Sequence, residues 1–280
     1  MSAFVFTGLV TLVAVAAGFV GSLTGLGGGV IIVPLLILCF GVDIRYAAGA
    51  SLLSVIATSS GAAAAYVKEG YSNIRIAMFL EIATTTGALV GASLAARLNA
   101  SWIAMVFGFV LVGSAWLTVR GHGSQRIAPT GDQRPSPSRL RLDSSYPSAH
   151  GPRPYHVQRV PWGFSVMFLA GGLSGLLGIG SGALKVIGMD GVMRVPFKVS
   201  TTTSNFMIGV TAAASAGVYV SRGYLDPRLA LPVVLGVLPG ALVGATVLPR
   251  IRAWKLRKAF SVVVLLLSVE MFYKGIRGGL

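Results

Sequence analysis

Two clusters of glycine contain the backbone groups best suited to bind an anion. Four of the five residues in Gly25–Gly29 are glycine, and Gly178, Gly180 and Gly182 form a second cluster. A glycine inside a helix costs about 1 kcal/mol relative to alanine, so each cluster predicts an interrupted helix. The half-helix that follows begins with N–H groups that lack intrahelical acceptors, and these groups favour a negative charge. The candidate donors are the backbone N–H groups of Gly27, Gly28, Gly29, Gly180, Ser181 and Gly182.

Close packing of helices is the alternative use of small residues in a membrane. Packing does not need three or four glycines bunched together, which favours the binding interpretation for the two clusters. The pairs Gly87/Gly91 and Gly240/Gly244 have the small-xxx-small spacing instead, and we expect them to pack helices.

Hydroxyl side chains occur at corresponding places in the two halves of the chain. Ser51 corresponds to Ser204, which has Thr203 and Asn205 as neighbours. Such side chains donate hydrogen bonds to an oxyanion without adding a buried charge. The alternative is that Ser and Thr in a membrane helix bond back to the backbone.

Glu81, Lys185 and Glu270 are candidate functional residues within apolar segments, where an ionisable residue costs at least about 2.5 kcal/mol at the membrane centre. Lys185 follows the second glycine cluster and takes the place of Ile32 in the first half. It would either neutralise a bound anion or extend to the aqueous edge. Glu81 corresponds to Val234 and is a candidate for carrying a coupling proton, whereas Glu270 is expected near a helix end.

The sequence contains no motif for catalysis or for metal binding. All three histidines (His122, His150 and His156) lie in 120–160, and Cys39 is the single cysteine. There is no paired carboxylate motif and no Ser-His constellation. We therefore expect a protein that is not an enzyme and has neither a metal nor an organic cofactor.

The composition indicates a polytopic membrane protein. The chain is 54% hydrophobic and 11% charged, with a mean hydropathy of +0.77, whereas a soluble domain carries about 25% charge. The net charge of +15 would suggest nucleic acid in a soluble protein. Here the charges separate apolar runs or lie in one linker, so they indicate membrane topology and no nucleic-acid partner.

Apolar segments occur in two sets of four, and the first segment of each set is interrupted by a glycine cluster. This predicts an all-α fold with an N-terminal repeat at 1–119, a flexible basic linker at 120–160 and a C-terminal repeat at 161–280. The linker is rich in Pro, Ser, Gly and Arg, a composition that does not bury enough apolar surface to fold alone. The segments are 4–40, 46–67, 74–96 and 101–119, then 161–193, 197–221, 228–249 and 258–273.

The two sets are an internal repeat with a constant offset. Gly87–Ala92 has the same six residues as Gly240–Ala245, and Arg97 recurs as Arg250 at the same offset. Chance does not hold one register over about 80 residues, and internal repeats are the architecture of many secondary transporters.

The distribution of charge predicts the orientation of the repeats. If each interrupted segment enters and leaves on one side, each half has an odd number of net crossings and the halves are inverted. A cytoplasmic linker then places the basic cluster 250–258 inside, as the positive-inside rule requires. If each interrupted segment crossed once, that cluster would face outside. We therefore predict inverted repeats with both termini outside.

The stretch Gly25–Pro34 reads Gly-Leu-Gly-Gly-Gly, four apolar residues and proline, and resembles the signature of the TauE/SafE sulfite exporter family. Ala50–Leu52 and Tyr66–Tyr71 also fit that family. The resemblance implies a bacterial-type inner-membrane permease of two halves. It implies substrates such as sulfite, thiosulfate, sulfoacetate or taurine-derived products. The second half departs from the pattern, with Ser181 for the middle glycine and Ile187 where Pro34 would recur.

We therefore predict a secondary transporter that exports sulfite or a small organosulfonate by alternating access, with Glu81 as its candidate proton carrier. Uptake of thiosulfate or an organosulfonate through the same site is the alternative within transport. A membrane-embedded enzyme or a non-transporting sensor is the alternative from another class. Membrane lipid surrounds such a protein, and assembly as a homodimer is compatible with the sequence.

Overall fold

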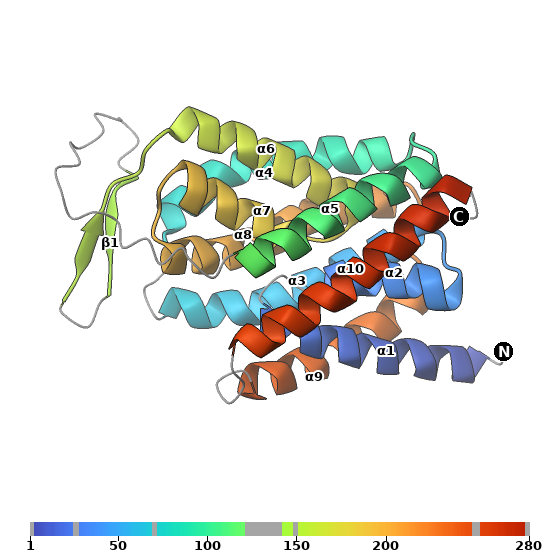
Figure 1. Ribbon diagram of the computed structural model, residues 1–280. Coiled ribbons are helices and arrows are strands. Elements are labelled where there is room, and N and C mark those ends of the chain that lie inside the picture. The colour runs from blue at the N-terminus through green and yellow to red at the C-terminus, as the bar shows by residue number, and fades with distance from the viewer. Residues whose placement is uncertain are drawn as a thin grey trace.

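The computed structural model describes residues 3–24, 28–68, 72–120, 142–147, 151–247 and 253–277. This part of the chain consists of helices and one two-stranded hairpin, which confirms the all-α class (Figure 1). The first half contains α1 (Ala3–Thr24), α2 (Gly29–Phe40), α3 (Ile44–Lys68), α4 (Ile74–Ala95) and α5 (Ala100–Arg120). The second half contains α6 (Val160–Leu177), α7 (Gly182–Val186), the π-helix η1 (Ile187–Val192), α8 (Phe197–Ser221), α9 (Pro227–Val247) and α10 (Ala253–Arg277).

The helices reproduce the duplication seen in the sequence. The helix α3 begins at Ile44 and α8 at Phe197, and the same offset relates the starts of α4 and α9 and of α5 and α10. The packing is reciprocal as well: α1 packs along α9, and α6 packs along α4. The counterparts α3 and α8 contact each other, as do α5 and α10. Exchanging the two halves leaves this set of contacts unchanged.

Small residues bring the helices of these pairs close together. A methyl group at Gly87 or Gly91 of α4 would collide with the backbone of Phe168 or Gly172 in α6. A methyl group at Gly240 of α9 would collide with the backbone of α1. These contacts match the packing expected from the small-xxx-small spacing.

Four described helices are long and apolar enough to cross a bilayer. Large apolar side chains point outward along them, for example Leu169 (65% exposed) and Leu242 (68% exposed). The N- and C-termini lie at one end of the bundle, and the hairpin lies at the opposite end (Figure 1). The candidate spans are Phe4–Gly21, Ile74–Ala95, Val160–Leu177 and Pro227–Gly244.

The hairpin lies inside the segment 120–160, where the sequence predicted no folded element. Its strands are β1 (Ser144–Tyr146) and β2 (Arg153–Tyr155), which pair antiparallel. An isolated two-stranded hairpin is marginally stable in water, so this one depends on the helices that it contacts. Leu142, Tyr155 and Val157 are buried in one cluster with residues of α4, η1 and α8.

Candidate functional site

The second glycine cluster is a tight, irregular break between α6 and α7. Gly178 ends α6 with φ +71°, and Gly180 has φ +75°. Such left-handed conformations suit glycine, which has no Cβ to clash with the backbone. Ser181 follows with φ +46°, and α7 begins at Gly182. The sequence prediction of an interrupted helix is therefore correct at this point.

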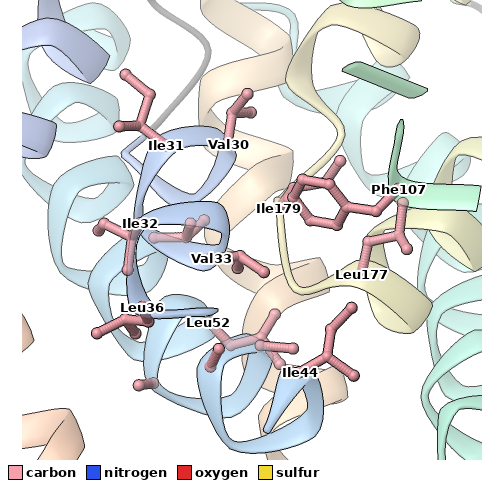
Figure 2. Packing of buried hydrophobic residues seen from close by; sticks show 14 of the residues in the cluster. Val30, Ile31, Ile32, Val33, Leu36, Ile44, Leu52, Phe107, Leu177 and Ile179 are labelled. Atoms are coloured by element: carbon pink, nitrogen blue, oxygen red, sulfur yellow. The ribbon is translucent and has the colours of Figure 1, made fainter. Parts of the chain in front are cut away.

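The first break separates α1 from α2, and the start of α2 lies against the second break. Gly27 lies in 25–27, outside the described residues, and Gly28 precedes the first residue of α2. A Cβ at Gly29 would lie 2.6 Å from Ser51 Oγ and 3.1 Å from the Gly178 carbonyl oxygen. The start of α2 therefore contacts the second break directly. Figure 2 shows Val30 and Val33 of α2 in one apolar cluster with Leu177 and Ile179.

The paired serines hold the second break in place. Ser51 Oγ donates to the Gly178 carbonyl at 2.8 Å, and Ser204 Oγ donates to the Gly182 carbonyl at 3.1 Å. Each hydroxyl therefore donates its one hydrogen to a backbone carbonyl at the break. In this conformation both serines position the loop. An anion could accept a hydrogen bond from either serine only if that serine's bond to the loop carbonyl broke.

The neighbours of Ser204 lie on other faces of α8. Thr203 Oγ1 accepts a hydrogen bond from the Asn73 N–H at 3.0 Å, at the start of α4. Asn205 is partly buried. The break and Thr203 are therefore on different sides of the helix, because consecutive helical residues are about 100° apart.

Ser181 combines a buried, unpartnered hydroxyl with a strained backbone. Its side chain is 5% exposed, and its Oγ has no hydrogen-bond partner among the described residues. Buried polar atoms normally have a partner, and a non-glycine residue at positive φ is strained. Such strain and such orphaned groups concentrate at functional sites. Ser181 aligns with Gly28, which has φ −64°, so the strain occurs at Ser181 and not at Gly28.

Lys185 lies one turn after Ser181, and its side chain is completely buried. Its N–H donates to the Ser181 carbonyl at 3.1 Å. Its Nζ donates to Thr211 Oγ1 at 2.6 Å and to the Met207 carbonyl at 3.2 Å. Lys185 therefore does not extend to the aqueous edge.

The hydroxyl of Thr211 links Lys185 to Glu81. Thr211 Oγ1 lies 2.7 Å from Glu81 Oε1, which also accepts from Thr85 Oγ1 at 3.0 Å. Glu81 is 7% exposed, and its Oε2 has no partner among the described residues. Two ionisable residues that the sequence singled out separately thus meet in one buried network.

Thr211 is not among the candidate residues predicted from the sequence, although it lies at the centre of the network. Thr211 follows Ser204 by seven residues, so the two share a face of α8. That spacing was a usable signal for Thr211. Thr85 carried no such signal, because its role depends on the position of Glu81 one turn before it.

The described residues contain no cluster suited to a metal ion. No group of three or more His, Cys, Asp or Glu side chains within this part of the chain is placed to hold a metal ion. His156 pairs instead with Asp143, at 2.9 Å, beside the hairpin.

Comparisons with known proteins give a family and several relatives for the chain. The family model of the sulfite exporter TauE/SafE matches residues 10–271. The probable membrane transporter protein YunE of Bacillus subtilis is 28% identical over 96% of this chain and 98% of its own length. A probable membrane transporter protein of Xylella fastidiosa is 24% identical over 92% and 91% of the two chains. No solved structure matches the chain.

Proposed function

The chain belongs to the sulfite exporter TauE/SafE family of membrane proteins, and from this premise we propose that it transports a small sulfur-containing anion. The leading substrate is sulfite or a small organosulfonate, and the leading direction is export across the cytoplasmic membrane. Uptake of thiosulfate or an organosulfonate through the same site is the alternative.

The observation that carries this proposal is the buried contact between the start of α2 and the second break, with the buried Lys185 one turn after Ser181. A buried lysine that follows an unpartnered serine hydroxyl by one helical turn suits a negatively charged guest, because a buried charge needs a partner. Lys185 supplies the positive charge and Ser181 Oγ a free donor. The N–H groups of Gly27 to Gly29 and of Gly180 to Gly182 complete the set, with Ser51, Thr203, Ser204 and Asn205 as further candidates. Glu81 is the candidate for proton coupling.

Alternating access follows from treating the two halves as inverted repeats. The reciprocal packing of α1 with α9 and of α6 with α4 supports this, because a two-fold axis between inverted halves would relate the two pairs. The position of both termini at the end opposite the hairpin also supports it (Figure 1). In this arrangement the linker is cytoplasmic, both termini are outside, and the site lies between the halves.

Flux into liposomes tests the proposal. We expect uptake of sulfite, thiosulfate or sulfoacetate by the wild-type protein, with weaker uptake of carboxylate analogues of the same size. Lys185→Met should weaken anion binding about tenfold or more, since truncating one partner of a buried charge pair costs about 2 kcal/mol or more. The exposed Lys198→Met is the matched control.

Other outcomes would change the conclusion. Flux of a cation or a neutral solute, with none of the sulfur anions carried, would exclude the anion proposal. Binding of an anion without any flux would favour the non-transporting sensor.

A further inference from the structure

The network of Lys185, Thr211 and Glu81 joins the two halves and is not repeated at the symmetry-related positions. Those positions hold Ile32 and Thr58 in the first half, for Lys185 and Thr211, and Val234 in the second half, for Glu81. Thr58 Oγ1 bonds back to its own helix, at 3.0 Å from the Ser54 carbonyl. The duplicated fold therefore does not need these charges, and their presence in one of the two equivalent places calls for a separate reason.

The network links a basic side chain to an acidic one in the conformation described here. Thr211 Oγ1 accepts from Lys185 at 2.6 Å and lies 2.7 Å from Glu81 Oε1, so it connects a cation to a carboxylate. The remaining carboxylate oxygen, Oε2, is buried and unpartnered. Buried polar atoms normally have a hydrogen-bond partner, and the described residues supply none for this oxygen.

Other titratable groups near Glu81 lie elsewhere on the helices that pack against α4. The helix α6 has none, and α8 has Lys198, exposed at its start, and Tyr219, whose hydroxyl donates to Gly175 at 3.0 Å. Of the elements that contact α6 and α8, α7 carries Lys185 and η1 carries the partly exposed Asp190. In the described residues, Lys185 is thus the charged group linked to Glu81.

We propose that Glu81 is the resident counter-charge of Lys185 in the empty transporter and that the transported anion replaces it, so that one proton binds Glu81 with each monovalent anion. This rests on the proposed function. Adding an anion to a neutral buried site leaves a net negative charge, which the low dielectric disfavours. A proton taken up by Glu81 from solvent restores neutrality, and the anion keeps Lys185 as its partner. The empty and the loaded site are then both neutral.

This charge balance determines which gradients drive transport. A monovalent anion that moves with one proton carries no net charge, so the membrane voltage neither drives nor opposes it. The pair moves toward the more alkaline side at equal anion concentrations. Export from an alkaline cytoplasm would then need an excess of the anion inside, and uptake would be favoured otherwise.

Binding to the purified full-length protein gives the first test, with sulfite and methanesulfonate as probes. The bound anion stabilises the protonated form of Glu81, so affinity should rise as the pH falls, up to about tenfold per pH unit for one linked proton. Glu81→Gln should make the affinity for methanesulfonate independent of pH, because this probe has no proton of its own to exchange at neutral pH. An affinity that varies equally in the wild type and Glu81→Gln would overturn the proposal.

Transport gives the second test, in liposomes with a pH-sensitive dye inside and the voltage clamped by potassium and valinomycin. We expect acidification of the lumen with a stoichiometry of about one proton per methanesulfonate and a flux that does not respond to voltage. Thr211→Val should weaken the coupling and Thr211→Ser restore it, while Thr58→Val, its counterpart in the first half, should leave the coupling unchanged. Voltage-driven flux without acidification would refute the coupling.

The two tests separate this inference from the proposed function. Flux of a sulfur anion without proton movement would retain the transporter and remove the coupling. Binding that depends on pH through Glu81 but gives no flux would retain the coupled site and remove transport. Lys185→Met/Glu81→Gln, which removes both charges together, should fold and fail to bind the anion; if it binds methanesulfonate as the wild type does, Lys185 is not the anion's partner.

Discussion

At the scale of single residues, the second break stores strain at a serine. Ser181 adopts φ +46° although the sequence has glycine on both sides, at 180 and 182. A left-handed conformation costs a non-glycine residue about 1 kcal/mol or more. The hydroxyl at this position is buried and has no partner among the described residues, so it does not compensate for the strain.

Ser181→Gly and Ser181→Ala separate these two contributions. Ser181→Gly should raise the free energy of unfolding by about 1 kcal/mol, because glycine relieves the strain. Ser181→Ala should not raise the free energy of unfolding, because alanine has a Cβ and is strained at this positive φ as serine is. Both should weaken sulfite binding to a similar degree, because both lack the hydroxyl. Unfolding in detergent and binding titrations measure the two effects, and wild-type affinity in both variants would remove Ser181 from the site.

Gly29→Ala tests whether the two breaks need their close contact. The added methyl group would lie 2.6 Å from Ser51 Oγ and 2.9 Å from Val55 Cγ2. We expect a loss of about 1–3 kcal/mol in stability, as for overpacking elsewhere, together with lower flux. Gly113→Ala in α5 is the control, because a Cβ there meets nothing within 4 Å. It should raise stability slightly, and similar behaviour of the two variants would contradict the contact.

At the scale of elements, the sequence predicted the helices well and the hairpin not at all. Each glycine cluster and each charged turn marks a helix end, and the duplication supports every boundary twice. The hairpin has no such pattern, because Leu142, Tyr155 and Val157 are scattered among polar residues. They are buried by contact with α4, η1 and α8, which no local pattern in 120–160 reveals.

Asn73 connects the hairpin to the helices, which makes its docking testable. Its Nδ2 donates to the Leu142 carbonyl at 3.2 Å and to Tyr155 Oη at 2.6 Å. Burial raises the pKa of the Tyr155 hydroxyl. Asn73→Ala removes both bonds, each worth about 1 kcal/mol, and also the side-chain cap of α4. Hydrogen exchange of residues 144–155 should become about tenfold faster or more, whereas Asn99→Ala should leave it unchanged.

At the scale of the whole molecule, the two ends of the bundle differ although the halves correspond. A groove of about 920 Å³ opens at the end opposite the hairpin, between the starts of α1, α3 and α9. The counterparts of its residues Thr11, Val42 and Tyr46 are Phe164, Val195 and Val199. These pack in one cluster with Leu142, Tyr155 and Val157 of the hairpin segment. The duplication predicts two equivalent grooves, and the linker fills one of them.

The same scale explains why the site could be predicted only in part. The paired glycine clusters and serines recur at a fixed offset, so the sequence alone placed Ser51, Ser204 and both breaks together. Lys185 and Glu81 have no counterparts in the other half, and no repeat links one to the other. Their meeting through Thr211 depends on how α4, α7 and α8 pack, which is a property of the assembled bundle.

Cysteine labelling in intact cells tests the predicted inversion of the halves. In a Cys39→Ala background, Ser145→Cys on β1 and Arg222→Cys after α8 each present an exposed thiol, one at each end of the bundle. From the basic cluster 250–258 we predict that the hairpin end faces the cytoplasm, because positive loops stay inside. An impermeant maleimide should therefore modify Arg222→Cys in intact cells and Ser145→Cys only after permeabilisation. The opposite pattern would reverse the orientation, and labelling of both thiols in intact cells would place the two ends on the same side and exclude a spanning bundle.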